Sequence, residues 1–468
     1  MRLADADTLS AVVDASPAEY TEVRYHARVL NEVRVVNGRV ERARSVTKSG
    51  AGIRVLMDGR WGFSSTGVTS RGALLKALDE ALRCARARGG DRRVKGLAEA
   101  RVARGLFMPE VNGRLEDHSI EEKVRVAIEA EREARAHPSG EVRSASSLYR
   151  ETMDAKIIVN SDGASAEVHD SKPEIVVSAI AGKGSRRISA SEGSCVTGGW
   201  DDLFRDRDHT AIAREASDKA VRLLGAGQPK GERTTVILDP AMVGLLSHEA
   251  IGHLVEADFV LSGSIARDLL GKEVASELVT LVDSGASNIV PYAAGTILVD
   301  DEGVMARTVR IIDRGILNSY LHDRESAYIF GVEPTGNARA FEYDDEPLIR
   351  MRNTYIEPGD YSLDEMVKEV GHGYMLKGAR NGQADANGEF MFGAEEAYLI
   401  EHGEVRQVFR SVSISGITMD VLKSIDAVSS SRDFRYDIGT GYCGKYQPMK
   451  VDGGGSYVRC TAIVGGVQ

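Results

Sequence analysis

The most constraining feature of this chain is an alternation of apolar and polar residues that begins near residue 19 and continues to residue 66. The run YTEVRYHARVLNEVRVV alternates with a period close to two and is followed by Asn37-Gly38; the next run ends at Asp58-Gly59. A period of two gives a strand one buried and one solvated face, and Asn-Gly and Asp-Gly favour tight hairpin turns. The N-terminal part is therefore predicted to form an antiparallel sheet.

Helical periodicity interrupts the strand pattern three times. Runs with an apolar residue every third or fourth position span residues 70–87, 119–137 and 209–226, and the strand pattern returns between 141 and 200. Ser70 and Ser119 precede the first two runs, and serine is a favoured N-cap residue. Strands and helices mixed in this way predict an α+β fold for the N-terminal part.

The pattern of predicted strands and helices changes after the polar segment GQPKGER, residues 227–233. A chain of 468 residues is too long for one ordinary domain. Beyond the linker, short strand patterns dominate and long helices are few, and 49 glycines against 11 prolines indicate many tight turns. We expect an α/β N-terminal domain with an antiparallel sheet and helices, residues 1–230, and a β-rich C-terminal domain, residues 231–468.

Charge and composition exclude several classes of protein. The net charge of −11 argues against a nucleic-acid surface, and no stretch is long and apolar enough for a membrane helix. The N-terminal residues MRLADADTLSAVVDAS carry acids where a signal peptide needs a basic and then an apolar region, so a cytoplasmic location is expected. Four cysteines without a C-x-x-C pair are too few for a disulfide scaffold.

The segment LLSHEAIGHLVEAD, residues 245–258, contains two histidines that bracket a glutamate, Glu249. Asp239 and Pro240 are a suitable N-cap and first residue for a helix over 240–257. His248 and His253 are five positions apart, which places them about 140° apart around a straight α-helix. They can share one metal ion only if the helix contains an extra residue in one turn, a π-bulge. Without this distortion they are two packed or exposed histidines.

A catalytic zinc site needs at least one further protein ligand. Cys443 is the first candidate, because it lies in the glycine-rich DIGTGYCGKYQP and Lys445 beside it would favour the thiolate. Cys460 alternates with polar residues in SYVRCTAIV, as a core residue does, and Cys84 and Cys195 lack a metal-like context.

Other side chains of the region leave alternatives open. His372 is a reserve ligand, although a solvated loop histidine fits it better. Glu256 and Asp258 could be further ligands, partners of the histidines or surface charges at a helix end.

The second half of the chain resembles the metal-bearing TldD type of the TldD/PmbA family. The resemblance rests on ordered segments between residues 235 and 465, which are H-E-A-x-G-H-x-x-E at 248–256, SELVTLVDSGA, DDEGV, PTGNARA, MRNTYIEPGD, GEFMFGAEEAYLIEHGEV and YCGKYQP. It implies a Zn²⁺-dependent peptidase whose metal ligands are His248, His253 and Cys443 and whose catalytic carboxylate is Glu249. It also implies unfolded peptide substrates and a dimer with a PmbA-type (TldE) subunit; a homodimer also fits the sequence.

Two other functions remain compatible with the sequence. A non-catalytic peptide-binding or regulatory subunit would have no need of Glu249 as a general base. A nucleic-acid-linked modulator would need a basic surface, which the charge balance does not favour. Among the polar groups of the matching segments, His322, Asn337 and Arg339 are candidates for oxyanion stabilisation, but ordinary loop hydrogen bonding explains each of them better.

Overall fold

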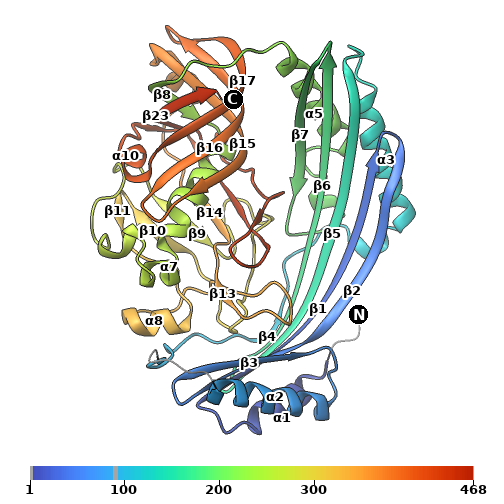
Figure 1. The fold of residues 1–468 in the computed structure, drawn as a ribbon, viewed down its shortest axis with the longest axis vertical. Coiled ribbons are helices and arrows are strands. Elements are labelled where there is room, and N and C mark those ends of the chain that lie inside the picture. Colours follow the sequence, from blue (N-terminus) through green and yellow to red (C-terminus); the bar gives the residue numbers. More distant parts are fainter. Residues whose placement is uncertain (1–3, 88–92, 467–468) are drawn as a thin grey trace.

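A computed structural model describes residues 4–87 and 93–466 and shows two halves that face each other (Figure 1). The first half is built on one long, curved sheet in the order β3-β2-β1-β5-β6-β4, with β7 paired to β6. Its pairings are antiparallel except for that of β4 with β6. The strands are β1 (Tyr20–Val36), β2 (Arg39–Met57), β3 (Arg60–Thr66), β4 (Arg104–Phe107), β5 (Val142–Asn160), β6 (Ser165–Lys183) and β7 (Arg186–Cys195).

Both predicted hairpin turns are present. Asn37 and Gly38 have φ values of 48° and 77°, and Asp58 and Gly59 have φ values of 51° and 67°. Two consecutive residues with positive φ form the turn whose twist matches the paired strands, and Asn, Asp and Gly adopt this conformation most readily. The turns therefore fix the register of β1 with β2 and of β2 with β3.

Helices cover the lower end of the long sheet and the face that is turned away from the second half (Figure 1). The three predicted helices are α2 (Arg71–Ala87), α3 (Ile120–Arg135) and α5 (His209–Leu224). Ser119 accepts a hydrogen bond from the Glu122 amide and so caps α3 as expected. Small and branched side chains from the helices pack on alternate residues of the strands in separate apolar clusters.

The second half contains a sheet that closes on itself. Its order is β17-β16-β15-β8-β23-β18, and β17 pairs with β23 as well as with β16. The strands are β8 (Glu232–Leu238), β15 (His372–Ala384), β16 (Glu389–Glu401), β17 (Glu404–Ile417), β18 (Ala427–Val428) and β23 (Val458–Gly466). The mixture of helices with mainly antiparallel sheets confirms the α+β class.

A second sheet in this half has the order β11-β10-β9-β14-β22-β19. Its strands are β9 (Leu281–Ser284), β10 (Val309–Asp313), β11 (Ile316–Leu317), β14 (Asn353–Ile356), β19 (Arg435–Tyr436) and β22 (Asp452–Gly455). The helical segment that carries both histidines contacts β14 and β22 of this sheet and β15 of the closed sheet. The segment is thus held between two sheets in the largest apolar cluster.

Short elements complete the chain. They are α1 (Ala6–Asp14), α4 (Trp200–Leu203), α6 (Pro240–Leu245), α7 (Ala257–Leu261), α8 (Arg324–Phe330), α9 (Leu363–Lys368), α10 (Thr418–Lys423), β12 (Ala338–Arg339), β13 (Leu348–Ile349), β20 (Tyr442–Cys443) and β21 (Met449–Lys450). Within the described ranges, no helix is long and apolar enough to cross a membrane.

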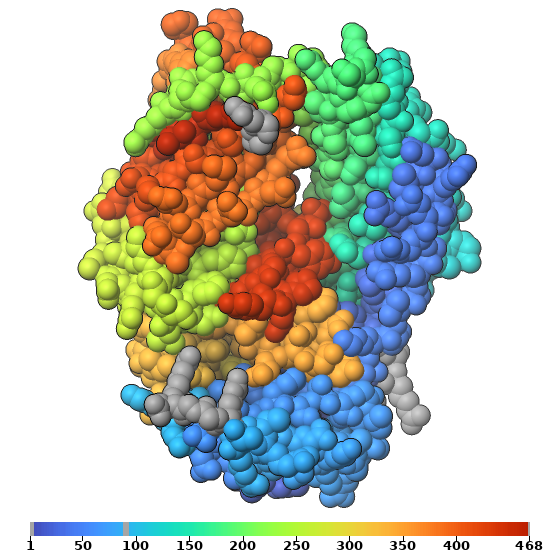
Figure 2. All heavy atoms as spheres, viewed as in Figure 1, coloured from blue at the N-terminus to red at the C-terminus, as the bar shows by residue number. Residues whose placement is uncertain are grey.

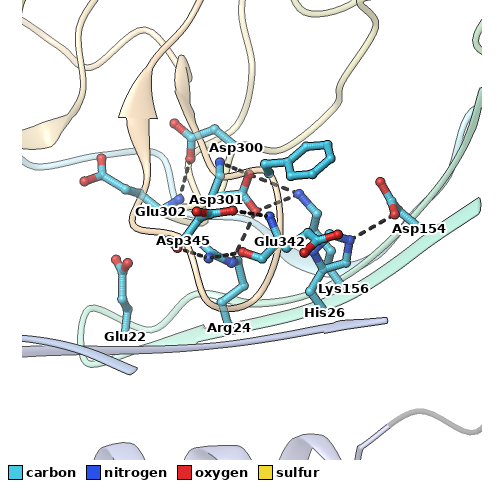
Figure 3. A network of polar contacts seen from close by, with 12 residues as sticks. Glu22, Arg24, His26, Asp154, Lys156, Asp300, Asp301, Glu302, Glu342 and Asp345 are labelled. Atoms are coloured by element: carbon cyan, nitrogen blue, oxygen red, sulfur yellow. Dashed lines mark hydrogen bonds and ion pairs between the residues drawn. The ribbon is translucent and has the colours of Figure 1, made fainter. Parts of the chain in front are cut away.

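Buried ion pairs join the two halves (Figure 3). Lys156 on β5 lies 2.7 Å from Asp301, and Arg54 on β2 lies 2.7 Å from Glu302. Arg24 on β1 donates to the main-chain oxygens of Glu342 and Asp345. Figure 2 shows the segment around residues 435–450 lying between the two halves on the visible face. The polar contacts set the position of the long sheet relative to the loops of the second half.

Candidate metal centre

The helical segment around the histidines is distorted as their spacing requires. Asp239 accepts a hydrogen bond from the Met242 amide at 2.9 Å and caps α6, with Pro240 as its first residue. From Leu246 to Gly252 the backbone is π-helical, and the His253 amide donates to the His248 carbonyl. The π-bulge that a shared metal site would require is therefore present.

The expectation of one helix over 240–257 is wrong at its C-terminal end. A 3₁₀ turn, His253–Val255, follows the π-helical residues. Glu256 then adopts an extended conformation, with φ −67° and ψ 123°, and α7 starts after it. The extended residue redirects the chain and turns the Glu256 side chain back toward His253.

The extra residue brings the two imidazoles together. The ring centroids of His248 and His253 are 4.9 Å apart, and the planes cross at 78°. Cys443, on β20, places its Sγ 3.5 Å from His253 Nε2. One ligand atom from each of the three residues lies within 4.8 Å of the others. Tetrahedral zinc with bonds of about 2.0–2.3 Å holds its ligand atoms about 3.3–3.8 Å apart, so a small inward movement would complete the site.

The surroundings of His248 give an independent indication that this cluster binds a ligand. The His248 side chain is buried, and its ring nitrogens make no hydrogen bond of ordinary geometry within the described part of the chain, although the ring is close enough to Cys443 to help lower the pKa of that thiol. A buried polar group without a partner costs about 1–3 kcal/mol. A metal ion bound by one of these nitrogens would remove part of that cost. The three side chains are therefore suited to bind a metal ion.

Glu256 orients the second histidine. Its fully buried carboxylate accepts a hydrogen bond from His253 Nδ1 at 2.7 Å, which leaves Nε2 facing Cys443. A carboxylate in this role fixes the tautomer of a ligating imidazole. Of the three alternatives for Glu256, the structure favours a partner of the histidine.

Lys445 does not act as the sequence suggested. Its ammonium group lies 3.1 Å from Glu256 and 2.6 Å from Asp258, and it donates to the Ile349 carbonyl. The expectation that Lys445 stabilises the thiolate is therefore corrected. Burial opposes ionisation of Cys443, but the neighbouring imidazoles outweigh it and lower the pKa of the thiol to about 4. Burial likewise opposes the charge on His253, but Glu256 and Cys443 raise its pKa to about 10.

Arg350 holds the loop that carries the cysteine. Its guanidinium is fully buried and donates to the carbonyls of Cys443 at 2.6 Å, Lys445 at 2.9 Å and Gln447 at 2.7 Å. One planar cation thus holds three alternate residues of the loop. The amino-acid sequence does not indicate this role of Arg350, because the residue lies 93 positions from Cys443 and no local pattern connects the two.

The remaining candidates lie in different environments. Glu249 is partly exposed, and its carboxylate lies 4.0 Å from His253 Nε2, at the rim of the cluster. The reserve ligand His372 is instead on β15, where it pairs with Glu232 at 3.0 Å. Cys460 lies in the main apolar cluster, as expected of a core residue. Cys84 is exposed on α2, and burial raises the pKa of Cys195 to about 12.

The three polar candidates for oxyanion stabilisation also have structural partners. His322 contacts Ser326 Oγ, and burial lowers its pKa to about 4. Asn337 donates to Asp283 and to a main-chain carbonyl. Arg339 donates to the carbonyls of Met351 and Lys450. These contacts agree with the reading of ordinary loop hydrogen bonding.

Comparisons with known proteins identify the family. The models of the PmbA/TldA metallopeptidase family match residues 21–85 as domain 1, 113–224 as the central domain and 231–453 as the C-terminal domain. A protein named metalloprotease from Methanothermobacter thermautotrophicus is 35% identical over 96% of both chains. The chain belongs to the PmbA/TldD metallopeptidase family. The zinc metalloprotease TldD homolog of Saccharolobus solfataricus is 30% identical over 96% of this chain and 97% of its own.

Two solved structures share the fold. TldE from Thermococcus kodakarensis superposes with a TM-score of 0.80 at 19% identity, over 98% of this chain and all of its own. A protein from Thermotoga maritima described as a putative modulator of a DNA gyrase gives a TM-score of 0.79 at 23% identity over 98% of both chains. The two-half architecture is therefore common to these proteins.

Proposed function

We propose that this protein is a zinc peptidase whose metal is held by His248, His253 and Cys443. The observation that carries the proposal is the convergence of these three side chains from a π-helical segment and a distant loop. The names of its relatives support a metal-dependent peptidase. Two imidazoles and a thiolate suit zinc, and three protein ligands leave a position open for water or substrate.

The chain's own groups supply the proton transfers. Zinc, when bound, would provide a Lewis acid for the scissile carbonyl and for a nucleophilic water. Glu249, at the exposed rim of the cluster, takes the proton of the attacking water and delivers it to the leaving amine. Glu256 keeps His253 in the tautomer that presents Nε2 to the site, and Arg350 keeps the Cys443 loop in place.

The substrates are proposed to be unfolded peptides in extended form. Residues 39–50 of β2 pair with β1 on one side only, because β3 pairs with residues 51–57 of the same strand. A free strand edge can add an extended peptide through main-chain hydrogen bonds, which select for shape rather than for sequence. A second family subunit of the TldE type, or a second copy of this chain, would complete the assembly.

The test combines hydrolysis with metal content. In a casein-derived peptide assay, Glu249→Gln is expected to lower the rate at least about a hundredfold, the range of general acid–base catalysis, while zinc content is unchanged. His253→Ala is expected to lose both, and His372→Ala serves as the matched control that keeps both. Full hydrolysis by Glu249→Gln would refute the assigned role. No hydrolysis by a zinc-loaded wild type, alone or with a TldE-type partner, would favour the alternative of a non-catalytic peptide-binding subunit.

A further inference from the structure

A cavity of about 440 Å³ lies between the long sheet and the loops of the second half. This is within the size range of small-ligand sites. Strands β1, β2, β5 and β6 form one wall, and residues 297–301, 339–342 and 442–450 form the other. In Figure 3, Lys156 of the long sheet points toward Asp301 of the second half, and Asp154 and Glu342, which also line the cavity, are drawn beside them.

The cavity is basic in a chain that is acidic overall. Seven of its lining residues are lysine or arginine and four are aspartate or glutamate, whereas the whole chain carries a net charge of −11. The acids are already engaged, since Asp154 accepts two hydrogen bonds from Arg28 and Asp301 accepts two from Lys156. A concave surface with an excess of one sign of charge attracts the opposite ion.

The excess positive charge is concentrated at one end. Arg150 and Lys450 share a single carboxylate, the buried Glu174. Arg339 also lines the cavity, and its guanidinium donates to the main-chain carbonyls of Met351 and Lys450. Burial and the nearby Arg350 lower the pKa of Arg339 to about 10, although Asp301 and Asp283 act in the opposite direction. Asp301 and Asp283 also lie near Arg339, but Asp301 is paired with Lys156 and Arg24, and Asp283 with Arg352. Arg150, Arg339 and Lys450 therefore have only Glu174 as a carboxylate that no other cation neutralises, which leaves room for a further negative charge.

The rest of the cavity suits an apolar group. The non-polar part of the lining includes Leu30, Val46, Val299, Phe341 and Met449. The Tyr442 ring lies 4.9 Å from the Arg150 guanidinium carbon and 4.3 Å from Lys450 Nζ. A fitting ligand therefore carries a carboxylate next to an apolar side chain, which is the chemistry of a peptide C-terminus. Tyr442 is also the neighbour of the proposed metal ligand Cys443.

We propose that this cavity binds the C-terminal carboxylate of a peptide, with Arg150, Arg339 and Lys450 as its anchor. The inference rests on the proposed peptidase function and specifies its substrates as peptides with a free C-terminus. Arg150 is the residue to test, because its side chain is 25% exposed and its removal leaves Glu174 paired with Lys450. Arg34, an exposed arginine on the same sheet that does not line the cavity, provides the matched control.

The experiment compares one peptide as the free acid, as its C-terminal amide, and as the amide with glutamate in the last position. For the wild type, the KM of the free acid is expected to be roughly tenfold lower than the KM of the amide. A factor of this size corresponds to the free energy of one charge-assisted hydrogen bond. Arg150→Gln should abolish this preference and Arg34→Gln should retain it. Preference for the glutamate-containing amide over the plain amide, without preference for the acid, would overturn the C-terminal assignment.

A binding measurement separates this proposal from the proposed hydrolysis. N-acetyl-leucine and N-acetyl-leucinamide are titrated calorimetrically into the full-length protein and into both variants. The acid is expected to bind the wild type and Arg34→Gln, and to bind Arg150→Gln at least roughly tenfold more weakly. Equal binding of the acid and the amide, or equal hydrolysis of the two peptides, overturns the proposal even if zinc-dependent hydrolysis is established.

Discussion

Gly252 is the position at which the local geometry of the histidine segment can be tested most sharply. A Cβ at this position would lie 2.1 Å from the Met351 sulfur and 2.8 Å from the Ser247 carbonyl oxygen. The Met351 side chain is buried at 1% exposure, and the Ser247 oxygen belongs to the π-helical backbone. Gly252→Ala must therefore move either the packed methionine or the turn that presents His253.

The size of the effect follows from these contacts. An ordinary contact would require the Met351 sulfur to retreat by about 1.5 Å, and overpacking of this kind costs about 1–3 kcal/mol. The higher helix propensity of alanine relative to glycine offsets up to about 1 kcal/mol of this cost in the free energy of unfolding. With a backbone atom also too close, the cost is expected near its upper end, so the free energy of unfolding should fall by about 2 kcal/mol. Displacement of His253 should also weaken zinc binding at least roughly tenfold.

Urea unfolding and chelator competition measure the two effects. Gly72→Ala is the matched control, because Gly72 lies in α2 with nothing within 4 Å of an added Cβ. It should be neutral or slightly stabilising. In a double-mutant cycle, Met351→Ala should remove most of the penalty of Gly252→Ala, since the two changes act on one contact. The reasoning is refuted if Gly252→Ala is as stable as Gly72→Ala and binds zinc as tightly as the wild type.

Three further predictions concern the groups around the site and between the halves. Glu256→Gln is expected to weaken zinc binding by about 10–100-fold, because a neutral amide holds His253 less firmly; unchanged affinity in chelator competition would contradict this. In Arg350→Lys, the lysine cannot donate to three carbonyls in one plane, so the Cys443 loop should be held less firmly. The Cys443 thiol should then react faster with a thiol reagent in zinc-free protein, and reactivity equal to that of the wild type would show that other contacts hold the loop. Lys156 and Arg24 outweigh burial and lower the pKa of Asp301 to about 2, so its stabilising charge is complete above about pH 4 and lost as the pH falls toward 2. Asp301→Asn should therefore cost about 2 kcal/mol in urea unfolding at pH 7 and progressively less below pH 4, and a difference independent of pH would argue against the ion pair.

Much of the fold follows from local patterns in the sequence. The turns at Asn37-Gly38 and Asp58-Gly59 and the cap at Ser119 depend on neighbouring residues, so they could be predicted without tertiary information. The π-bulge followed from the sequence only on the assumption that His248 and His253 share a metal ion, because their spacing permits a shared site in no other helical geometry. These features need only the preferred geometry of a few consecutive residues.

Other features depend on contacts between distant segments. Lys445 is adjacent to Cys443 in sequence, but its charge is neutralised by Glu256 and Asp258 across the site. Glu256 ends the helical segment because its carboxylate is buried against His253, which no local propensity indicates. Arg350 donates to main-chain carbonyl oxygens. Every residue has such an oxygen, so no sequence pattern indicates which ones are bound. Such roles become visible only when the chain is folded.

The central claim is that one zinc ion is bound by His248, His253 and Cys443, and the metal content of untagged protein tests it most directly. Mass spectrometry is expected to find about one zinc per chain in the wild type and in the exposed-cysteine control Cys84→Ser, and almost none in Cys443→Ser. The cobalt-substituted wild type should show a sulfur-to-metal charge-transfer band. A wild type that takes up no zinc after incubation with the metal, or a Cys443→Ser variant that keeps its full complement, would contradict the account.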